Sequence, residues 1–304
     1  MNKVKLYLME LRAPFFTATI VPILLGTAIA YNLNSAFNWS YFLLTLLGGL
    51  LLHGGSNVIN DYFDHKSNND ELNKEFVRPF TGGSRMIQEK LLTPKEVLVE
   101  AIVCLVLGSA IGIYLTIKIG WVILAIGIFG VFSAVFYVDP KVKLVSRGIG
   151  ELFIGLNFGI AMTLGAYYVQ TGLFSWIPII ASIPVAILIA ALLYINEFQD
   201  AKADEAVGKN HLVIRLGKKR AVTGYVLLMI ATYLAVVIGV VTDSLPPITL
   251  IALLTMPIAF KAIKVAQENY EDSAKLVPAN VSTILNHLLT GLLLIVSFFV
   301  DKWI

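Results

Sequence analysis

The sequence predicts an all-α protein: a polytopic bundle of nine transmembrane helices with loops that cap its cytoplasmic end. Of the 304 residues, 57% are hydrophobic and 14% are charged, and the mean hydropathy is +0.79. Soluble domains carry roughly 25% charged residues. Apolar stretches of about 20 residues, the length that a bilayer core requires, recur along the chain. We therefore expect one membrane-embedded domain, residues 1–304.

The expected spans follow these apolar stretches in order. Short polar or glycine-containing breaks separate some of them, and the longer connections carry most of the charge. The basic N-terminus leads into a long apolar run without a convincing cleavage site, so we expect a retained first span. The expected limits are 13–32, 40–61, 96–117, 119–138, 148–169, 175–197, 221–242, 246–266 and 281–300.

The basic residues predict the orientation of the bundle. With the N-terminus in the cytoplasm, 21 of the 23 Lys and Arg fall on the cytoplasmic side, and only Lys118 and Lys302 fall outside. This bias predicts an integral protein of the cell membrane, with lipid as its surroundings and no nucleic-acid partner. Cys104 is the single cysteine, which excludes a disulfide within the chain.

Two acidic sets, each at the end of an apolar run, need a functional explanation. The first set recurs at steps that share one helix face: Asn57, Asn60, Asp61 and Asp64. The second set, far downstream, steps by four: Asn196, Asp200 and Asp204. A solvated helix end is a sufficient explanation for an isolated aspartate. It does not explain why two sets, each on one face of a helix, gather acids within otherwise basic connections.

A magnesium site explains both sets. Mg²⁺ binds through a few carboxylates together with waters and substrate phosphates, so two facing sets suit a diphosphate. Arg and Lys are the side chains that pair with phosphate. Such cations follow both sets: Lys66, Arg78, Arg85, Lys202, Lys209 and Arg215. A diphosphate site at the mouth of an apolar bundle suggests an isoprenoid diphosphate, whose tail would lie inside the bundle.

Loss of diphosphate from such a substrate gives an allylic cation, which aromatic faces can stabilise. Four aromatic residues are expected near cytoplasmic span ends, and Tyr137 is the best placed: Tyr62, Phe63, Phe136 and Tyr137.

These stretches resemble a known family. The run NDYFDHKSNND, followed by GGSRMIQEKLLTP, resembles the first aspartate-rich motif of the UbiA superfamily of intramembrane prenyltransferases. The run NEFQDAKADEAVGKNHLVIRLG resembles the second motif. Asp70 stands six residues after Asp64, and YYVQTG follows the fifth span. Both features are similar to the MenA-like branch, which includes the bacterial enzymes that prenylate 1,4-dihydroxy-2-naphthoate for menaquinone biosynthesis.

The resemblance implies Mg²⁺-dependent transfer of a polyprenyl group, for example from geranylgeranyl diphosphate, to an aromatic acceptor. It implies Mg²⁺ ligands at Asp61, Asp64, Asp70, Asp200 and Asp204. It implies that Asn57, Asn60 and Asn196 bind diphosphate or metal-bound water. It implies phosphate contacts at Lys66, Arg78, Arg85 and Lys202. Tyr137 would shield the cation, and Glu197, which departs from the motif's usual pattern, would play a supporting part.

Two alternatives remain open at this stage. One is transfer of a geranylgeranyl group to a glycerol phosphate ether lipid, which uses the same donor chemistry. The other is a secondary transporter with ion-coupling acids. Transporter sites usually lie near the bilayer midplane, whereas nearly every acid here falls at a cytoplasmic span end or in a loop.

Overall fold

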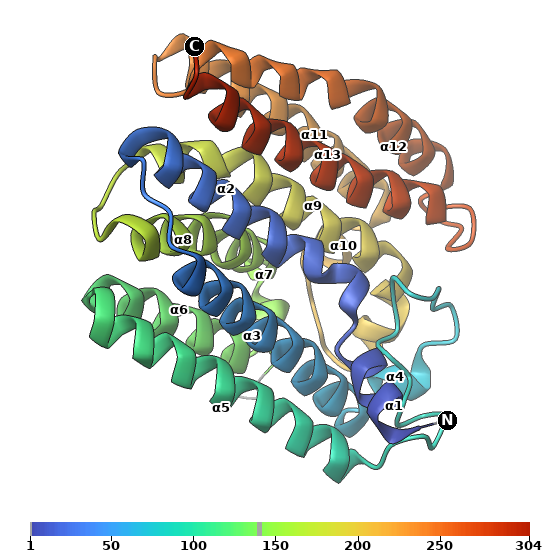
Figure 1. Ribbon diagram of the computed structural model, residues 1–304. Helices are drawn as coiled ribbons and strands as arrows, with labels where there is room; N and C mark the ends of the chain where they lie inside the picture. Colours follow the sequence, from blue (N-terminus) through green and yellow to red (C-terminus); the bar gives the residue numbers. More distant parts are fainter. Residues whose placement is uncertain (1, 139–141) are drawn as a thin grey trace.

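A computed structural model describes residues 2–138 and 142–304, and these residues form a bundle of long, side-by-side helices (Figure 1). Lys141, which the charge count places on the cytoplasmic side, lies outside the described residues. The helical elements are α1 (Lys3–Glu10), η1 (Ala13–Phe16), α2 (Thr17–Asn34), α3 (Trp39–Lys66), α4 (Asn69–Leu72), α5 (Pro94–Ile119), α6 (Trp121–Val138), η2 (Leu144–Arg147), α7 (Gly150–Ile154), η3 (Gly155–Ala161), α8 (Met162–Thr171), α9 (Ile177–Ala206), α10 (Leu212–Leu216), α11 (Lys218–Val241), η4 (Pro247–Thr255), α12 (Met256–Asn269) and α13 (Val277–Asp301).

The predicted all-α class is confirmed, and the predicted number of spans is close. In the described part of the chain, eight helical stretches are long and apolar enough to cross a membrane. The ninth expected span, 119–138, corresponds to the shorter apolar helix at Trp121–Tyr137.

Two helices extend beyond the apolar stretches that predicted them. The span expected at 40–61 continues as α3 to Lys66, and the span expected at 175–197 continues as α9 to Ala206. The added residues are polar but compatible with a helix, and no Pro or Gly interrupts them. Both acidic sets therefore stand on continuous helices rather than in flexible loops.

The fifth expected span, 148–169, is divided in the structure. It consists of α7, the π-helical segment η3 and α8. The η3 segment packs closely against α9: a Cβ atom on Gly159 would lie 2.4 Å from the Cα atom of Ala186. Small residues permit such close approach between membrane helices.

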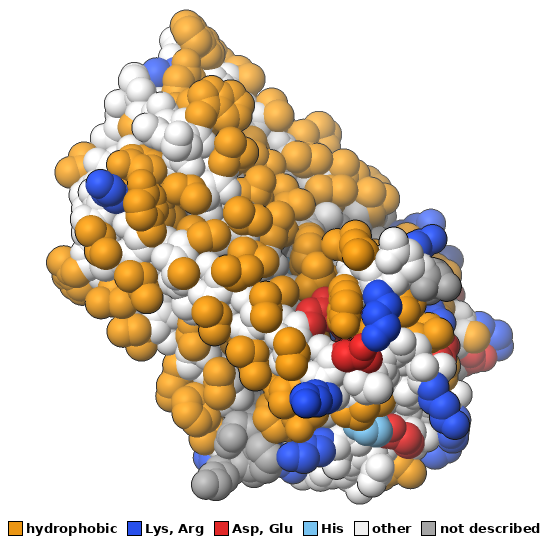
Figure 2. Space-filling model, turned by 60° about the horizontal axis from the view of Figure 1, so that its bottom comes forward, with side chains coloured by type: hydrophobic (Ala, Val, Ile, Leu, Met, Phe, Trp, Pro, Cys, Tyr) orange, Lys and Arg blue, Asp and Glu red, His pale blue; other side chains and the backbone are white. Residues whose placement is uncertain are grey.

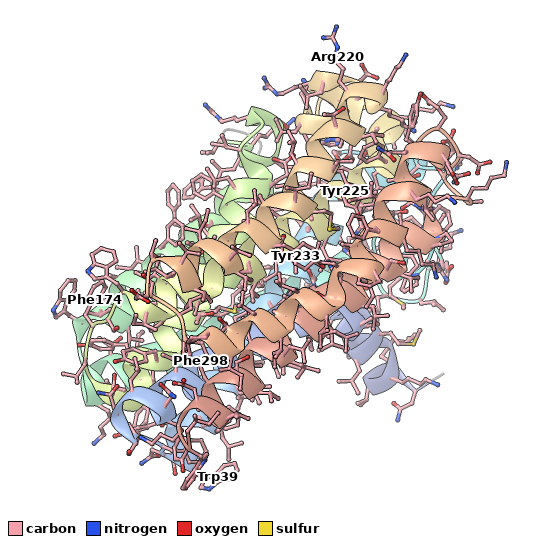
Figure 3. All side chains as sticks on the ribbon, turned by 90° about the horizontal axis from the view of Figure 1, so that it is seen from above. Trp39, Phe174, Arg220, Tyr225, Tyr233 and Phe298 are labelled. Atoms are coloured by element: carbon pink, nitrogen blue, oxygen red, sulfur yellow. The ribbon has the colours of Figure 1, made fainter. Side chains whose placement is uncertain are left out.

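The surface of the bundle is mostly apolar, and most of its charge lies at one end. Large hydrophobic side chains such as Ile117, Trp121 and Val241 are more than 70% exposed, which suits contact with lipid rather than water. Charged side chains gather at one end, as Figure 2 shows. In Figure 3, Arg220 lies at the opposite end of the bundle from Trp39 and Phe174.

Candidate active site

The first acidic set lies at the end of α3, where the loop after α4 folds back onto it. One oxygen of Asp61, Oδ2, accepts a hydrogen bond from the backbone N–H of Ser84 at 2.7 Å. The other oxygen, Oδ1, lies 3.7 Å from Arg12 Nη1. Gly83 has a φ of +69°, and a Cβ atom there would lie 2.9 Å from Asp61 Oδ1. The glycine therefore allows the loop to contact this aspartate.

Lys209 joins the two acidic sets. Its ammonium group forms an ion pair with Asp64 of α3 and lies 3.8 Å from Asp204 Oδ1 of α9. The side chain of Lys209 is buried between the two helices. The negative charges of Asp64 and Asp204 outweigh burial and raise the pKa of Lys209 above its ordinary value, so the lysine is charged here.

The short helix α4, which directly follows α3, provides further contacts to the second set. Asn69 Nδ2 donates to Asp204 Oδ1 at 2.7 Å. Just beyond α4, Asn73 Nδ2 donates to Asp200 Oδ1 at 2.6 Å. The aspartates of α3 and α9, which are far apart in the sequence, thus lie around one small region. Neither asparagine was singled out from the sequence, because each falls in a loop-like run without helical periodicity.

Asp70 lies beside this region and is almost fully buried. Its carboxylate accepts a hydrogen bond from Gln88 Nε2 at 3.3 Å, and its backbone carbonyl accepts one from Arg85 Nη1 at 2.6 Å. Burial, together with the negative charges of Asp64 and Asp61, raises the pKa of Asp70 to about 9. This carboxyl group is therefore neutral at pH 7 unless a cation joins it.

The four basic residues that are expected to contact phosphate lie in different surroundings. The Lys66 ammonium lies 5.7 Å from the Tyr62 ring centroid, near Asp64 in sequence. Arg85 lies over Phe76 and supports α4 through its bond to Asp70. The other two are paired with loop glutamates rather than with the aspartates: Arg78 with Glu89, and Lys202 with Glu75. Their contact with phosphate stays a prediction.

A cavity of about 340 Å³, here called the lysine pocket, opens beside Asp64. Its charged and hydroxyl-bearing lining consists of Asp64, Lys66, Ser67, Lys143 and Lys209. Three ammonium groups and a hydroxyl group suit an anion with several oxygens, such as a diphosphate. Lys143 was counted from the sequence only as an orientation residue, and its place in this pocket was not foreseen.

A larger cavity of about 370 Å³, here called the apolar cavity, runs into the bundle. Most of its walls are aliphatic side chains and glycines from α2, α3, α5, α6, η3 and α9. Several predicted site residues line it: Asn57, Asn60, Tyr137 and Asn196. Such a cavity suits a hydrocarbon chain.

The polar residues that line the apolar cavity have fixed orientations. Asn57 Nδ2 donates to the carbonyl of Leu11 at 3.0 Å, and Asn60 Nδ2 donates to Asp64 Oδ2 at 3.1 Å. Asn196 Oδ1 accepts from Asn280 at 2.7 Å. The hydroxyl of Tyr137 is buried without a hydrogen-bond partner in the described part of the chain.

Sequence reasoning also missed Arg12 and His211 as residues of the site. Arg12 adopts a left-handed conformation with a φ of 57°, lines the apolar cavity and approaches Asp61. His211 is fully buried; its Nε2 lies 3.4 Å from Asp204 Oδ2 and its Nδ1 lies 3.4 Å from Glu197 Oε2. Glu197 therefore lies beside His211, and its supporting part stays a prediction. The signal for His211 was present in GKNHLV, within the run that resembles the second motif.

The chemistry of these donors fits a divalent metal ion. Asp61 Oδ1 and Asn69 Oδ1 are buried without hydrogen-bond partners among the described residues, and carboxylate and amide oxygens are ligands for hard cations. In the described part of the chain, no three His, Cys, Asp or Glu side chains converge closely enough to hold a metal ion together. The Lys209 ammonium lies between Asp64 and Asp204 instead.

The fold and the site define an integral membrane protein with an acidic and basic ligand site at one end of an apolar cavity. Residues 19–295 match the model of the UbiA prenyltransferase family. The chain therefore belongs to this family, and it is a prenyltransferase. The transporter alternative is wrong.

Two relatives match nearly the whole chain. A protein of Synechocystis sp., named 2-carboxy-1,4-naphthoquinone phytyltransferase, is 26% identical over 97% of this chain and 93% of its own length. A protein of Bacillus subtilis, named 1,4-dihydroxy-2-naphthoate octaprenyltransferase, is 28% identical over 94% of this chain and 89% of its own length.

Solved structures share the fold. A UbiA homologue from Archaeoglobus fulgidus bound to DMAPP and Mg²⁺ has a TM-score of 0.64 at 17% identity, covering 95% of this chain and 99% of that one. An apo UbiA homologue from Aeropyrum pernix has a TM-score of 0.66 at 14% identity, covering 94% and 97%. These similarities establish the architecture of the bundle.

Proposed function

We propose that this protein transfers a polyprenyl group from a prenyl diphosphate to an aromatic ring and releases diphosphate. The acceptor we propose is a quinone precursor of the 1,4-dihydroxy-2-naphthoate class. The observation that carries the proposal is the meeting of α3 and α9 aspartates with the largely buried Lys209 at the end of an apolar cavity. The names of the Synechocystis and Bacillus relatives support the class of acceptor.

The donor would bind with its two ends in different surroundings. The diphosphate would lie in the lysine pocket, where Lys66, Lys143 and Lys209 neutralise its charge. The hydrocarbon tail would lie in the apolar cavity. We assign Mg²⁺ to the buried oxygen donors around Lys209, and bound Mg²⁺ would make diphosphate a better leaving group. The proposed ligands are Asp61, Asp64, Asp70, Asp200 and Asp204.

The residues of the apolar cavity would control the reaction itself. The bond between C1 of the donor and the diphosphate oxygen breaks, a bond forms between C1 and an acceptor carbon, and that carbon loses its proton. Tyr137 would present its ring to the allylic cation. The aliphatic walls would exclude water, which otherwise captures the cation. Three cavity amides would bind the edge of the diphosphate or its bound water: Asn57, Asn60 and Asn196.

We propose that the charged end of the bundle faces the cytoplasm. The excess of Lys and Arg on the connections at this end supports this orientation. Modification of single introduced cysteines in intact cells by a membrane-impermeant reagent tests the orientation. Labelling at position 219 without permeabilisation would contradict it.

Turnover by the purified protein tests the reaction. We would supply geranylgeranyl diphosphate with either 1,4-dihydroxy-2-naphthoate or a geranylgeranylglyceryl phosphate, in MgCl₂ or in EDTA, and measure diphosphate release and the mass of the product. We expect a prenylated naphthoate in MgCl₂ and no product in EDTA. Turnover of the glycerol phosphate lipid with none of the naphthoate would replace this proposal with the ether-lipid alternative.

A further inference from the structure

Two polar side chains lie deep in the apolar cavity, away from the charged end. His53 stands on α3 four residues before Asn57 and seven before Asn60, so the three share one face of the helix. All three line the cavity. Seven residues of helix place His53 roughly 10 Å further into the bundle than Asn60. The second side chain, Asn157, comes from the π-helical segment η3.

The ring of His53 is held in one orientation with one nitrogen free. Its Nδ1 lies 2.8 Å from the hydroxyl of Thr19. The ring packs against Phe16 and Phe158, with centroids 5.3 Å and 4.5 Å away. The other nitrogen, Nε2, has no hydrogen-bond partner among the residues that the structure describes. His53 therefore brings an available hydrogen-bonding atom to a cavity whose walls are otherwise mostly apolar.

Asn157 offers a second free atom to the same cavity. Its Nδ2 donates to the carbonyl of Phe153 at 2.8 Å, which fixes the direction of the amide. Its Oδ1 is buried without a partner in the described part of the chain. The neighbouring position on α6 is Gly130, where even a Cβ atom would stay 3.9 Å from this oxygen. Local π-helices are frequent at functional sites, and an unpaired buried oxygen costs free energy unless a ligand satisfies it.

We propose that His53 and Asn157 bind the phenolic hydroxyl groups of the aromatic acceptor, an inference that rests on the proposed function. The prenyl donor has no polar atom outside its diphosphate, so it leaves these two side chains unsatisfied. Asn157 Oδ1 can only accept a hydrogen bond, and a hydroxyl group supplies the donor that it lacks. Nε2 of His53 can bond a hydroxyl in either direction. The pair would hold the ring so that a carbon beside a hydroxyl faces C1 of the donor.

Acceptor binding tests this assignment without a chemical step. The protein is saturated with an unreactive geranylgeranyl thiolodiphosphate and Mg²⁺, and the Kd of 1,4-dihydroxy-2-naphthoate is compared with that of its methyl ethers. For the wild type, we expect the Kd of a methyl ether to exceed that of the dihydroxy compound by about three- to tenfold for each hydrogen bond that methylation removes. Equal affinity of the wild type for all these compounds would overturn the proposal.

Two variants test whether the preference for hydroxyl groups over methyl ethers depends on His53 and Asn157. His53→Phe keeps an aromatic ring and Asn157→Leu keeps the side-chain shape, and each removes the polar atoms. We expect each to weaken binding of the dihydroxy compound while leaving binding of the matching methyl ether nearly unchanged. His53→Gln should restore part of the preference. Ser133→Ala is the control, because Ser133 lines the same cavity but its hydroxyl already donates to the carbonyl of Phe129.

The outcomes separate this inference from the proposed function. The wild type could bind and turn over the naphthoate while each variant loses as much affinity for the methyl ether as for the dihydroxy compound. That result would overturn the role of His53 and Asn157 but not the proposed function. Failure of the wild type to bind or use any aromatic acceptor would overturn both the inference and the proposed function.

Discussion

At the scale of single residues, Lys209 holds together the two acidic halves of the site. Its ammonium contacts Asp64 of α3 and Asp204 of α9, and its positive charge offsets their negative charges. Bringing several carboxylates together without a counter-charge would cost much free energy. Lys209 therefore stabilises the packing of the two acidic sets against each other.

Replacing Lys209 with Met should destabilise the metal-free protein. Asp64 and Asp204 would stay buried without their cation, and breaking such a buried pair costs about 3–5 kcal/mol of the free energy of unfolding. Added Mg²⁺ should restore part of that loss and should stabilise the variant more than it stabilises the wild type. Thermal unfolding in detergent, with EDTA or with MgCl₂, measures both effects.

The control is Lys219→Met, which removes an exposed lysine and should leave the unfolding temperature unchanged. A Lys209→Met protein that unfolds at the wild-type temperature in EDTA would show that Lys209 does not hold the two helices together.

The surroundings of Glu10 should make the stability of the folded protein depend on pH. It is fully buried, and Ser84 Oγ donates a hydrogen bond to it. Burial, the negative charge of Asp61 and that of Glu100 outweigh the opposing effects of Ser84 and Arg12, and they raise the pKa of Glu10 to about 8 from 4.5. The folded state thus keeps a proton that the unfolded chain loses above about pH 4.5, so stability falls as the pH rises from about 4.5 to about 8.

Glu10→Gln should remove this dependence because glutamine carries no titrating proton. Unfolding temperatures of the metal-free protein, measured between about pH 5 and pH 8, should fall less steeply for the variant than for the wild type. Glu268→Gln, at an exposed glutamate of α12, should keep the wild-type slope. Parallel curves for Glu10→Gln and the wild type would contradict the account of Glu10.

At the scale of helices, α9 is the element against which the bundle packs. Its buried face includes Leu188, Ala191 and Ile195, and η3 lies against it where Gly159 meets Ala186. Both η3 and α9 also line the apolar cavity.

Gly159→Ala should therefore lower the stability of the protein. The new Cβ atom would lie 2.4 Å from atoms of Ala186, so η3 must move away from α9. Gly127→Ala is the matched control on α6, since nothing lies within 4 Å of its Cβ position. Alanine favours a helix over glycine by about 1 kcal/mol, so the control should unfold at the same or a higher temperature. An equal unfolding temperature for both variants would contradict this packing.

The sequence pattern predicts the helices better than it predicts the contacts between them. Apolar stretches and the spacing of Asn and Asp place α3 and α9 and their acidic faces. The spacing carries both helices past the apolar boundary to Asp64 and Asp204, but it does not mark where they end, at Lys66 for α3 and at Ala206 for α9. The π-helical segment η3 also has no periodic signal, because it depends on close packing against α9.

The basic residues show the same limit at the site. Lys66 lines the lysine pocket as expected near the first set. Lys202, although two residues from Asp200, points to Glu75, while Lys209 reaches both acidic sets. Helical phase and loop conformation decide which cation reaches the acids, and proximity in sequence does not determine either.

At the scale of the whole molecule, the bundle joins an apolar interior to a charged end. The apolar cavity provides a dry path for a hydrocarbon chain, and the lysine pocket provides charges for a diphosphate. The two meet where Asn60 of the cavity donates to Asp64 of the pocket. A lipid diphosphate has the same division between an apolar tail and a charged head, which links the architecture to prenyl transfer.

The central claim is that aspartates of α3 and α9 hold one diphosphate together. The most direct test is the Kd of geranylgeranyl thiolodiphosphate in MgCl₂, measured for the wild type, Asp64→Asn, Asp200→Asn and the exposed-loop control Asp272→Asn. We predict that each site variant loses at least about tenfold in affinity, as losses around metal sites usually do, while the control matches the wild type. Wild-type affinity in either Asp64→Asn or Asp200→Asn would contradict the claim.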